Sequence, residues 1–248
     1  MSSNFSIIIP TLNEERALPR LLESIAAQSF AGELEVIVVD GESTDSTRDV
    51  TLAYKKSISN LSVITTHRGL SHQRNFGASK AQHDYLVFID ADSVLSREFL
   101  ARLSKQLDRT TDVIALPLIL PYKGSPLDYI FTLGAYVFFM LARFTGPVVT
   151  GMCLITSKAI HQRIGGFDEK AVYAEDIEYG LRSFRQGATY HIYCRARLFG
   201  STRRGRKLGR LKLGSTWLKW YFDTWRHGPI TDRSKYNYKY DNDSRSST

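Results

Sequence analysis

Short, continuously apolar runs alternate with helix-like segments along the first part of the chain, and this pattern constrains the fold most. The runs that predict strands lie at Phe5–Pro10, Leu34–Val39, Leu61–Thr65 and Tyr85–Ile89. The segments that predict helices lie at 13–28, 47–56, 71–81 and 96–107. Strands that are apolar throughout are typical of a parallel sheet covered on both faces. The pattern therefore predicts βαβ units around a mostly parallel sheet.

The rest of the chain continues this pattern with one unusual insertion. Strands are predicted at 113–120, 155–156 and 189–193, and helices at 157–164 and 175–186. Between them, an apolar helical insertion at about 126–145 contains fourteen residues without a charge, Tyr129–Ala142. That is shorter than the roughly 20 residues needed to cross a bilayer.

The predicted fold class is α/β, Rossmann-like, with a mostly parallel central sheet flanked by helices. A length of 248 residues suits one such domain, predicted over 1–202. A basic amphipathic helical extension is predicted at 203–228, followed by a polar tail at 229–248.

The positive charge of the chain is local. The net charge is +8, and residues 203–226 hold eight Lys and Arg against one acidic residue, Asp223. In the same segment Leu218, Tyr221, Phe222 and Trp225 repeat at helical spacing, which favours the headgroup region of an anionic membrane. An alternative is that this segment and the insertion pack on each other or across a dimer interface. The apolar stripe argues against a nucleic-acid partner; the oligomeric state stays open.

The N-terminal sequence and the cysteine content predict the cellular compartment. The first residues, MSSNFSIIIP, lack the basic and long apolar regions of a secretory signal. Two cysteines, Cys153 and Cys194, are too few for a disulfide framework. We therefore expect a cytoplasmic protein that binds peripherally to the cytoplasmic face of the membrane. If it does, we expect a lipid-linked acceptor.

Two carboxylates, Asp90 and Asp92, follow directly after the strand Tyr85–Ile89. In parallel sheets the carboxyl ends of the strands line the ligand crevice. Two oxygen ligands at this spacing suit one hard cation, Mg²⁺ or Mn²⁺, which proteins often share with substrate phosphates. The alternative is that Asp92 or Ser93 caps the next helix.

Six motifs in order identify the chain as similar to family 2 glycosyltransferases, over about residues 5–205. They are FSIIIPTLNEE, VIVVDGESTDST, RNFGASKAQHDYLVFIDADS, GGFDE, AEDIEYGLRS and STRRGRKLG. The resemblance implies the GT-A fold, a nucleotide-sugar donor and inversion at the anomeric carbon. In one place the chain departs from the family: DGEST has a single acidic residue, Asp40, before its glycine, which leaves the choice of base, and so UDP or GDP, open.

The resemblance also implies roles for individual residues. Pro10, Leu12 and Glu14 would line the base and ribose, Asp40 would accept a hydrogen bond from the base, and Arg74 would lie near the base or diphosphate. Asp90 would approach the ribose and the metal, and Asp92 would bind the metal. Asp176 would be the catalytic base with Glu175 beside it, and Arg203 and Arg204 would bind the diphosphate.

These roles fit the chemistry of sugar transfer. A cation and guanidinium groups stabilise the departing diphosphate, and an acceptor hydroxyl needs a general base. Simpler explanations exist for single residues: Arg74 could pair with a carboxylate, and Glu175 and Asp176 could serve only as acidic residues of a first helical turn.

Two other functions remain open from the sequence. A sugar-phosphate nucleotidyltransferase has a similar fold but usually needs a glycine-rich basic loop after the first strand, and PTLNEERALPR has no glycine. A non-catalytic, membrane-associated nucleotide-sugar binding module would not need the carboxylates Asp92 and Asp176.

Overall fold

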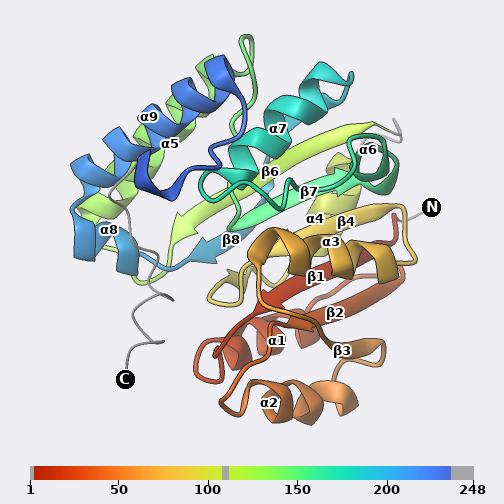
Figure 1. Ribbon diagram of the computed structural model, residues 1–248. Coiled ribbons are helices and arrows are strands. Elements are labelled where there is room, and N and C mark those ends of the chain that lie inside the picture. The colour runs from red at the N-terminus through yellow and green to blue at the C-terminus, as the bar shows by residue number, and fades with distance from the viewer. Residues whose placement is uncertain (1–2, 108–111, 236–248) are drawn as a thin grey trace.

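The computed structural model describes residues 3–107 and 112–235, which form one eight-stranded sheet with helices on both faces (Figure 1). The strand order is β3-β2-β1-β4-β7-β6-β8-β5. The strands are β1 (Phe5–Thr11), β2 (Leu34–Asp40), β3 (Leu61–Thr65), β4 (Tyr85–Ile89), β5 (Val94–Leu95), β6 (Val113–Pro121), β7 (Cys153–Ser157) and β8 (Thr189–Gly200). Four of the seven neighbouring pairs in the described part are parallel, which confirms the predicted mostly parallel sheet, and the other three are antiparallel.

The helices follow the predicted order closely. The α-helices are α1 (Leu18–Ala26), α2 (Thr47–Ala53), α3 (Leu70–Lys80), α4 (Phe99–Gln106), α5 (Pro126–Ala142), α6 (Lys158–Arg163), α7 (Glu175–Arg185), α8 (Arg203–Leu208) and α9 (Arg210–His227), and the 3₁₀ turns are η1 (Tyr54–Lys56) and η2 (Arg233–Lys235). The predicted polar tail continues beyond them, and its residues 236–248 lie outside the described part.

The first four parallel strands deliver their carboxyl ends to one edge of the sheet. β1 lies between β2 and β4, with Thr11 opposite Asp40 and Ile8 opposite Phe88. Every residue of β1 is buried, as expected for a strand covered on both faces. Pro10 lies beyond the last residue of β1 that pairs with β4, where a missing N–H disturbs the sheet least.

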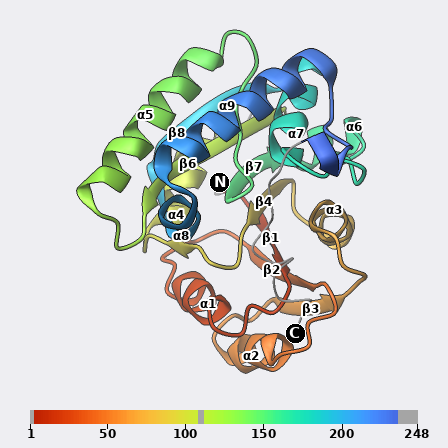
Figure 2. The same cartoon turned by 60° about the vertical axis from the view of Figure 1, so that its left-hand side comes forward.

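Two apolar layers cover the two faces of the sheet. On one face, α1 and α4 pack on the strands through buried leucines such as Leu21 and Leu103. On the other, α3, α6 and α7 form the layer, and α5 and α9 extend it beside β6. Figure 2 shows α5 and α9 side by side on this second layer. The protein therefore has a helix-sheet-helix architecture with an added helical pair at one end.

Two differences from the sequence pattern concern β8 and β5. β8 runs to Gly200, well beyond the predicted end at residue 193, and shifts register against β6 between Pro117 and Leu118. Its outer part alternates charged and apolar residues, which hid it from a search for apolar runs. β5 pairs with this extension and precedes α4, whose N-cap residue is Glu98. The prediction that Asp92 or Ser93 caps this helix is therefore wrong.

The C-terminal extension forms two helices instead of one. Gly209, at φ 83°, separates α8 from α9. α9 packs on α5 through ring contacts such as Phe138 with Tyr221, as the packing alternative predicted. Tyr221 is therefore buried, whereas Leu218 and Phe222 of the predicted stripe are exposed.

α5 begins with a strong helix start. Ser125 and Asp128 form a capping box, in which the backbone N–H of Ser125 donates to Asp128 Oδ2 at 2.7 Å, and Pro126 occupies the first helical position. Within residues 3–107 and 112–235, we find no helix whose length and apolar character would let it cross a membrane.

Candidate active site

The loops after β1 and β2, residues 12–17 and 41–46, are joined to each other by side-chain hydrogen bonds; we call them the donor-side loops. Asn13 adopts a left-handed conformation at φ 56°, and its side-chain oxygen accepts the Thr44 N–H at 2.8 Å. In return the Asn13 N–H donates to Ser43 Oγ at 2.9 Å. These bonds explain why α1 begins at Leu18, later than the predicted residue 13.

The predicted donor residues lie on or beside these loops. Asp40 ends β2 and is buried, and its Oδ2 accepts the Ser43 N–H at 3.1 Å. Pro10 is buried at the end of β1, while Leu12 and Glu14 in the next loop are half-buried. The structure thus brings these four predicted residues to the same edge of the sheet.

Gln73 of α3 holds the ends of β1 and β2 from behind, a role that the sequence did not reveal. Its side-chain amide donates to Thr11 O at 2.9 Å and to Val39 O at 2.8 Å. Gln73 also lies so close to Gly41 that a Cβ at this glycine would meet it at 2.9 Å. The only sequence signal is a polar residue on the inner side of the helix that carries Arg74.

Arg74 is almost fully buried and joins three segments. Its Nη1 donates to Glu175 Oε1 at 3.0 Å, and its Nη2 donates to Asp90 Oδ1 at 3.1 Å and to Gly151 O at 3.0 Å. Burial alone would lower the pKa of Arg74, but the charges of Asp90, Glu175 and Asp176 outweigh it and raise that pKa. The carboxylate pairing considered from the sequence is therefore observed, and a role beside the base or diphosphate stays a prediction.

Gly151 connects this network to Asp176. Its N–H donates to Asp176 Oδ2 at 2.6 Å, and the Ile177 N–H donates to Asp176 Oδ1 at 2.8 Å. A Cβ on Gly151 would lie 2.7 Å from Arg74 Nη2, so the close approach of the backbone to the guanidinium requires glycine. Gly151 was not identified from the sequence.

The electrostatic environment of Asp176 favours its protonated form more than water does. Burial, followed by the charge of Glu175, raises the pKa of Asp176 to about 7, although Arg74 and the two backbone donors act in the opposite direction. A carboxylate with a pKa near neutrality is suited to proton transfer at physiological pH. Burial next to a like charge is a known route to such a shift.

α7, which carries both acidic residues, starts from a strained residue. Ala174 is its N-cap residue and has φ 56°, a conformation that residues with a Cβ adopt at a cost. Glu175 and Asp176 occupy the first helical turn, where the helix dipole favours negative charge. Strain at a residue beside clustered polar groups is typical of functional sites.

Asp90 and Asp92 lie in the turn that links β4 to β5. Asp90 accepts from Arg74, and its side chain remains 32% exposed. Asp92 is half-buried. In residues 3–107 and 112–235, no three or more His, Cys, Asp or Glu side chains are grouped closely enough to hold a metal by themselves.

A cavity of about 470 Å³ opens at Asp90, Glu175 and Asp176, whereas Asp92 is not among its lining residues. Arg74, Asp90, Glu175 and Asp176 line one end of it, together with Ser201 and Thr202, which the sequence reasoning missed. Two buried polar atoms at this end, Arg74 Nε and Thr150 Oγ1, have no hydrogen-bond partner within the described residues.

Of the two arginines predicted to bind a diphosphate, Arg203 is exposed and begins α8 directly after Thr202. The side chain of Arg204 lies outside the described side chains. Their predicted role is therefore neither supported nor contradicted by contacts.

Similarities to known proteins agree with this geometry. Over 119 residues the chain is 34% identical to "Poly(ribitol-phosphate) beta-N-acetylglucosaminyltransferase TarS" of Staphylococcus aureus, covering 46% of this chain and 21% of that protein. Over 103 residues it is 39% identical to a "PGL/p-HBAD biosynthesis glycosyltransferase" of Mycobacterium tuberculosis, covering 40% of each. The matched region thus spans less than half the length of these relatives.

Solved structures share the fold at lower identity. S. aureus TarS in complex with UDP-GlcNAc superposes with a TM-score of 0.65 and 23% identity, over 80% of this chain and 58% of that one. The mannosyltransferase PcManGT from Pyrobaculum calidifontis, in complex with GDP-Man and Mn²⁺, gives a TM-score of 0.67 and 21% identity, over 88% and 65%. These neighbours confirm the predicted GT-A fold.

The sequence itself matches the family model described as "Glycosyl transferase family 2" over residues 6–164. This range contains β1 to β4, Asp90, Asp92 and Gly151, and it extends over more than half of the 248 residues. The chain therefore belongs to glycosyl transferase family 2.

Proposed function

We propose that this protein transfers a sugar from a nucleotide-diphosphate donor to an acceptor hydroxyl, with inversion and with Asp176 as general base. The observation that carries the proposal is the convergence of Arg74, Asp90, Glu175 and Asp176 at one cavity beside the carboxyl ends of the parallel strands. Ligands of open α/β sheets bind at this edge. Family membership and the nucleotide-sugar complexes of the structural neighbours support the same reaction.

The nucleotide is proposed to bind along the donor-side loops. Pro10, Leu12 and Glu14 would line its base and ribose, and Asp40 would accept a hydrogen bond from the base. The hydrogen bonds between the two loops fix this surface before a ligand arrives, which lowers the entropy cost of binding. The neighbours' ligands include UDP-GlcNAc and GDP-Man, so UDP and GDP are both tested below.

A divalent cation, Mn²⁺ or Mg²⁺, fits the residues at the end of β4. Asp90 and Asp92 offer only oxygen ligands, which these cations prefer, and two carboxylates leave coordination positions for substrate phosphates. The three carboxylates around Arg74 leave an excess of negative charge when all are ionised. When bound, the cation would act as a Lewis acid on the departing diphosphate. Arg203 and Arg204 are proposed to share that charge stabilisation.

Asp176 is proposed to take the proton of the attacking hydroxyl. The N–H groups of Gly151 and Ile177 orient its carboxylate, and its raised pKa matches the demands on a base near neutral pH. Glu175 is held in place by Arg74 and raises the pKa of Asp176 through its charge. A single base that acts opposite the leaving group gives inversion at the anomeric carbon.

Calorimetric titration of UDP and GDP, with and without Mn²⁺, tests the donor site. We expect one nucleotide to bind in a Mn²⁺-dependent manner and to lose that dependence in Asp92→Ala. Asp176→Asn should retain nucleotide binding and lose about a thousandfold of the transfer rate. Absence of binding by both nucleotides, with and without Mn²⁺, would reject the donor site, and full turnover of Asp176→Asn would reject the base.

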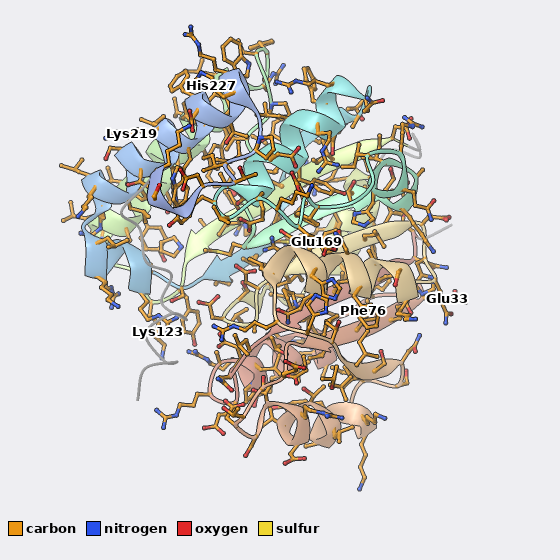
Figure 3. All side chains as sticks on the ribbon, viewed as in Figure 1. Glu33, Phe76, Lys123, Glu169, Lys219 and His227 are labelled. Atoms are coloured by element: carbon orange, nitrogen blue, oxygen red, sulfur yellow. The ribbon has the colours of Figure 1, made fainter. Side chains whose placement is uncertain are left out.

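We also propose peripheral contact with an anionic membrane on the cytoplasmic side, through the outer faces of α5 and α9. Leu133 and Leu141 of α5 are 67% and 66% exposed, and a helix that is apolar on every side normally has a covering on every side. Figure 3 shows Lys219 and His227 on α9 at the periphery of the molecule, away from the sheet. Basic and aromatic side chains together favour anionic lipid surfaces.

Vesicle co-sedimentation at low salt tests this contact. Phosphatidylglycerol-containing vesicles should bind the protein and pure phosphatidylcholine vesicles should bind it weakly, with the difference lost at high salt. The triple variant Lys212→Gln, Lys219→Gln, Arg226→Gln should reduce binding to the anionic vesicles. A protein that ignores both kinds of vesicle contradicts the contact.

A further inference from the structure

The cavity that opens at Asp176 continues between α5 and α9 as an apolar space. We call this part the apolar channel and define it by Phe131, Phe138, Leu213, Trp217 and Tyr221, all of which line the same cavity as Asp90 and Asp176. Ring contacts between Phe131 and Trp217, at 5.8 Å, and between Phe138 and Tyr221, at 5.4 Å, join its two walls. One continuous space therefore has a charged end and an apolar end.

Two tyrosine hydroxyls along the apolar channel already have partners within the protein. The Tyr136 hydroxyl donates to Pro117 O and accepts from the Ile119 N–H, each at 2.6 Å. The Tyr221 hydroxyl donates to Gly146 O at 2.8 Å. A chain of sugars or polyols in this space would lose water without gaining matching hydrogen bonds, which is unfavourable. A hydrocarbon chain would carry no such cost.

An ion pair also lines the cavity. Arg210 Nε donates to Asp128 Oδ1 at 2.8 Å, and this bond holds the pKa of Asp128 below its usual range. Both residues line the cavity. Because each charge is neutralised by the other, this pair attracts neither anions nor cations strongly, and the apolar walls dominate recognition.

We propose that the apolar channel binds the hydrocarbon chain of an amphiphilic acceptor, whose hydroxyl group then lies at Asp176. The proposal rests on the glycosyltransferase function proposed above and specifies the class of its acceptor. The exposed apolar side chains of α5 and α9, such as Leu133 and Phe222, lie on the same two helices that line the channel. The exposed basic side chains of Lys212, Lys219 and Arg226 fit an anionic surface around it.

The chain offers a built-in reporter. Its three tryptophans, Trp217, Trp220 and Trp225, all lie on α9, and the first two line the cavity. Trp225→Phe removes the tryptophan outside the cavity and leaves Trp217 and Trp220 as the only fluorescent indoles. The probe is undecyl maltoside with two bromines at the end of its chain, used below its critical micelle concentration, because bromine quenches indole fluorescence on contact.

In the Trp225→Phe protein we expect saturable quenching by the probe. Unbrominated hexyl, octyl and decyl maltosides should compete, with affinity rising about fourfold for each added methylene. Gly134 lies on the cavity, and an added Cβ there meets no atom within 4 Å, so Gly134→Phe adds bulk at the channel without a clash. This variant should weaken probe binding by about tenfold, which corresponds to a few methylene contacts.

Two controls separate the channel from the surface. The first control, Gly134→Ala, changes helix propensity in the same direction as Gly134→Phe but adds little volume. The second, Val137→Phe, adds bulk on the outer face of α5, where Val137 is 52% exposed. The affinity of both variants for the probe should be within about twofold of that of the Trp225→Phe protein, because surface substitutions usually have small effects of this size. Absence of quenching overturns the proposal. Quenching that Val137→Phe weakens as much as Gly134→Phe does overturns it in favour of surface binding.

Self-association is the competing explanation for the apolar faces. If sedimentation shows a dimer that Leu133→Asp dissociates, and the probe does not quench either form, a second copy covers this region and the channel proposal fails. The test is independent of the donor site: loss of probe binding with nucleotide binding intact rejects only the acceptor class. Probe binding without any nucleotide binding rejects the proposed function instead.

Discussion

The donor-side loops and the α5–α9 pair are built by different physical means. The loops at residues 12–17 and 41–46 are held by side-chain hydrogen bonds to backbone groups, with Asn13 and Gln73 as the main contributors. The helical pair is held by aromatic contacts and leaves apolar faces exposed on its outer side. The donor-side loops are held by contacts within the protein, whereas the α5–α9 pair has an exposed apolar surface that matches an apolar partner.

This difference suggests how specificity is divided. Directional hydrogen bonds define one geometry, which suits a ligand with fixed polar groups such as a nucleotide. Apolar walls tolerate related shapes and select mainly by size and apolarity. Arg74 and Asp176 lie where the two regions meet, and the predictions below test whether the two regions really differ in this way.

The largest effect is expected from comparing a Leu→Ala substitution in α1, which follows the first donor-side loop, with one in α5. Leu21 of α1 is fully buried and Leu133 of α5 is 67% exposed. Leu21→Ala should lower the free energy of unfolding by about 3 kcal/mol, because it leaves a cavity in a packed core. Leu133→Ala should change it by less than about 0.5 kcal/mol. Urea denaturation measures both, and equal losses would mean that the α5 face is covered in solution.

The next effect concerns the close approach at Gly151. Gly151→Ala places a Cβ 2.7 Å from Arg74 Nη2, so the guanidinium must move away from Asp90 or Glu175. We expect a loss of about 2 kcal/mol in the free energy of unfolding. Gly134→Ala, in open space on α5, should instead stabilise by up to about 1 kcal/mol through helix propensity. Similar values for the two alanine variants would contradict the tight packing around Arg74.

A somewhat smaller effect is expected at Gln73. Gln73→Met keeps the length of the side chain but removes the two bonds to Thr11 O and Val39 O, and should destabilise the fold by about 1–2 kcal/mol. Nucleotide affinity should fall as well, because the donor-side loops lose their support. The control Gln82→Met, at an exposed position, should change neither quantity appreciably. Unchanged affinity in Gln73→Met would show that the loops are positioned without it.

The smallest effect is a pH dependence of activity. If ionised Asp176 is the base, kcat/KM should fall about tenfold for each pH unit below the pKa of about 7. The same group affects stability with a defined sign. Its folded pKa is raised, so the folded state holds a proton that the unfolded state has already released, and stability falls as the pH rises from about 4 to about 7.

The effect of Asp176 on stability is best measured as a difference in the free energy of unfolding between two proteins. The buried His161 has a pKa lowered to about 4 by burial, then by the charge of Arg182, and it changes stability in the opposite direction over part of this pH range. Comparing the wild type with Asp176→Asn cancels that contribution. The Asn variant should gain stability relative to the wild type as the pH rises toward 7, and a constant difference would contradict the raised pKa.

Local patterns predicted most of the framework. The runs at Phe5–Pro10 and Leu34–Val39 became β1 and β2, and the uncharged insertion became α5. The second half of β8 was missed because Arg195 and Arg197 interrupt its apolar pattern, and both are exposed. For the same reason the two-residue strand β5, which exists only as the partner of that extension, had no signal of its own.

The sequence alone determined which segments avoid water, where the polar strand ends occur and to which family the chain belongs. It could not determine that Arg74 of α3 would be bonded to Glu175, which is 101 residues away, or that Gly151 would hold Asp176. Nor could it decide which side of α9 is buried, since Tyr221 faces the core and Phe222 does not. Periodicity records the need for burial within one element, whereas the choice of partner depends on packing among elements that are distant in the chain.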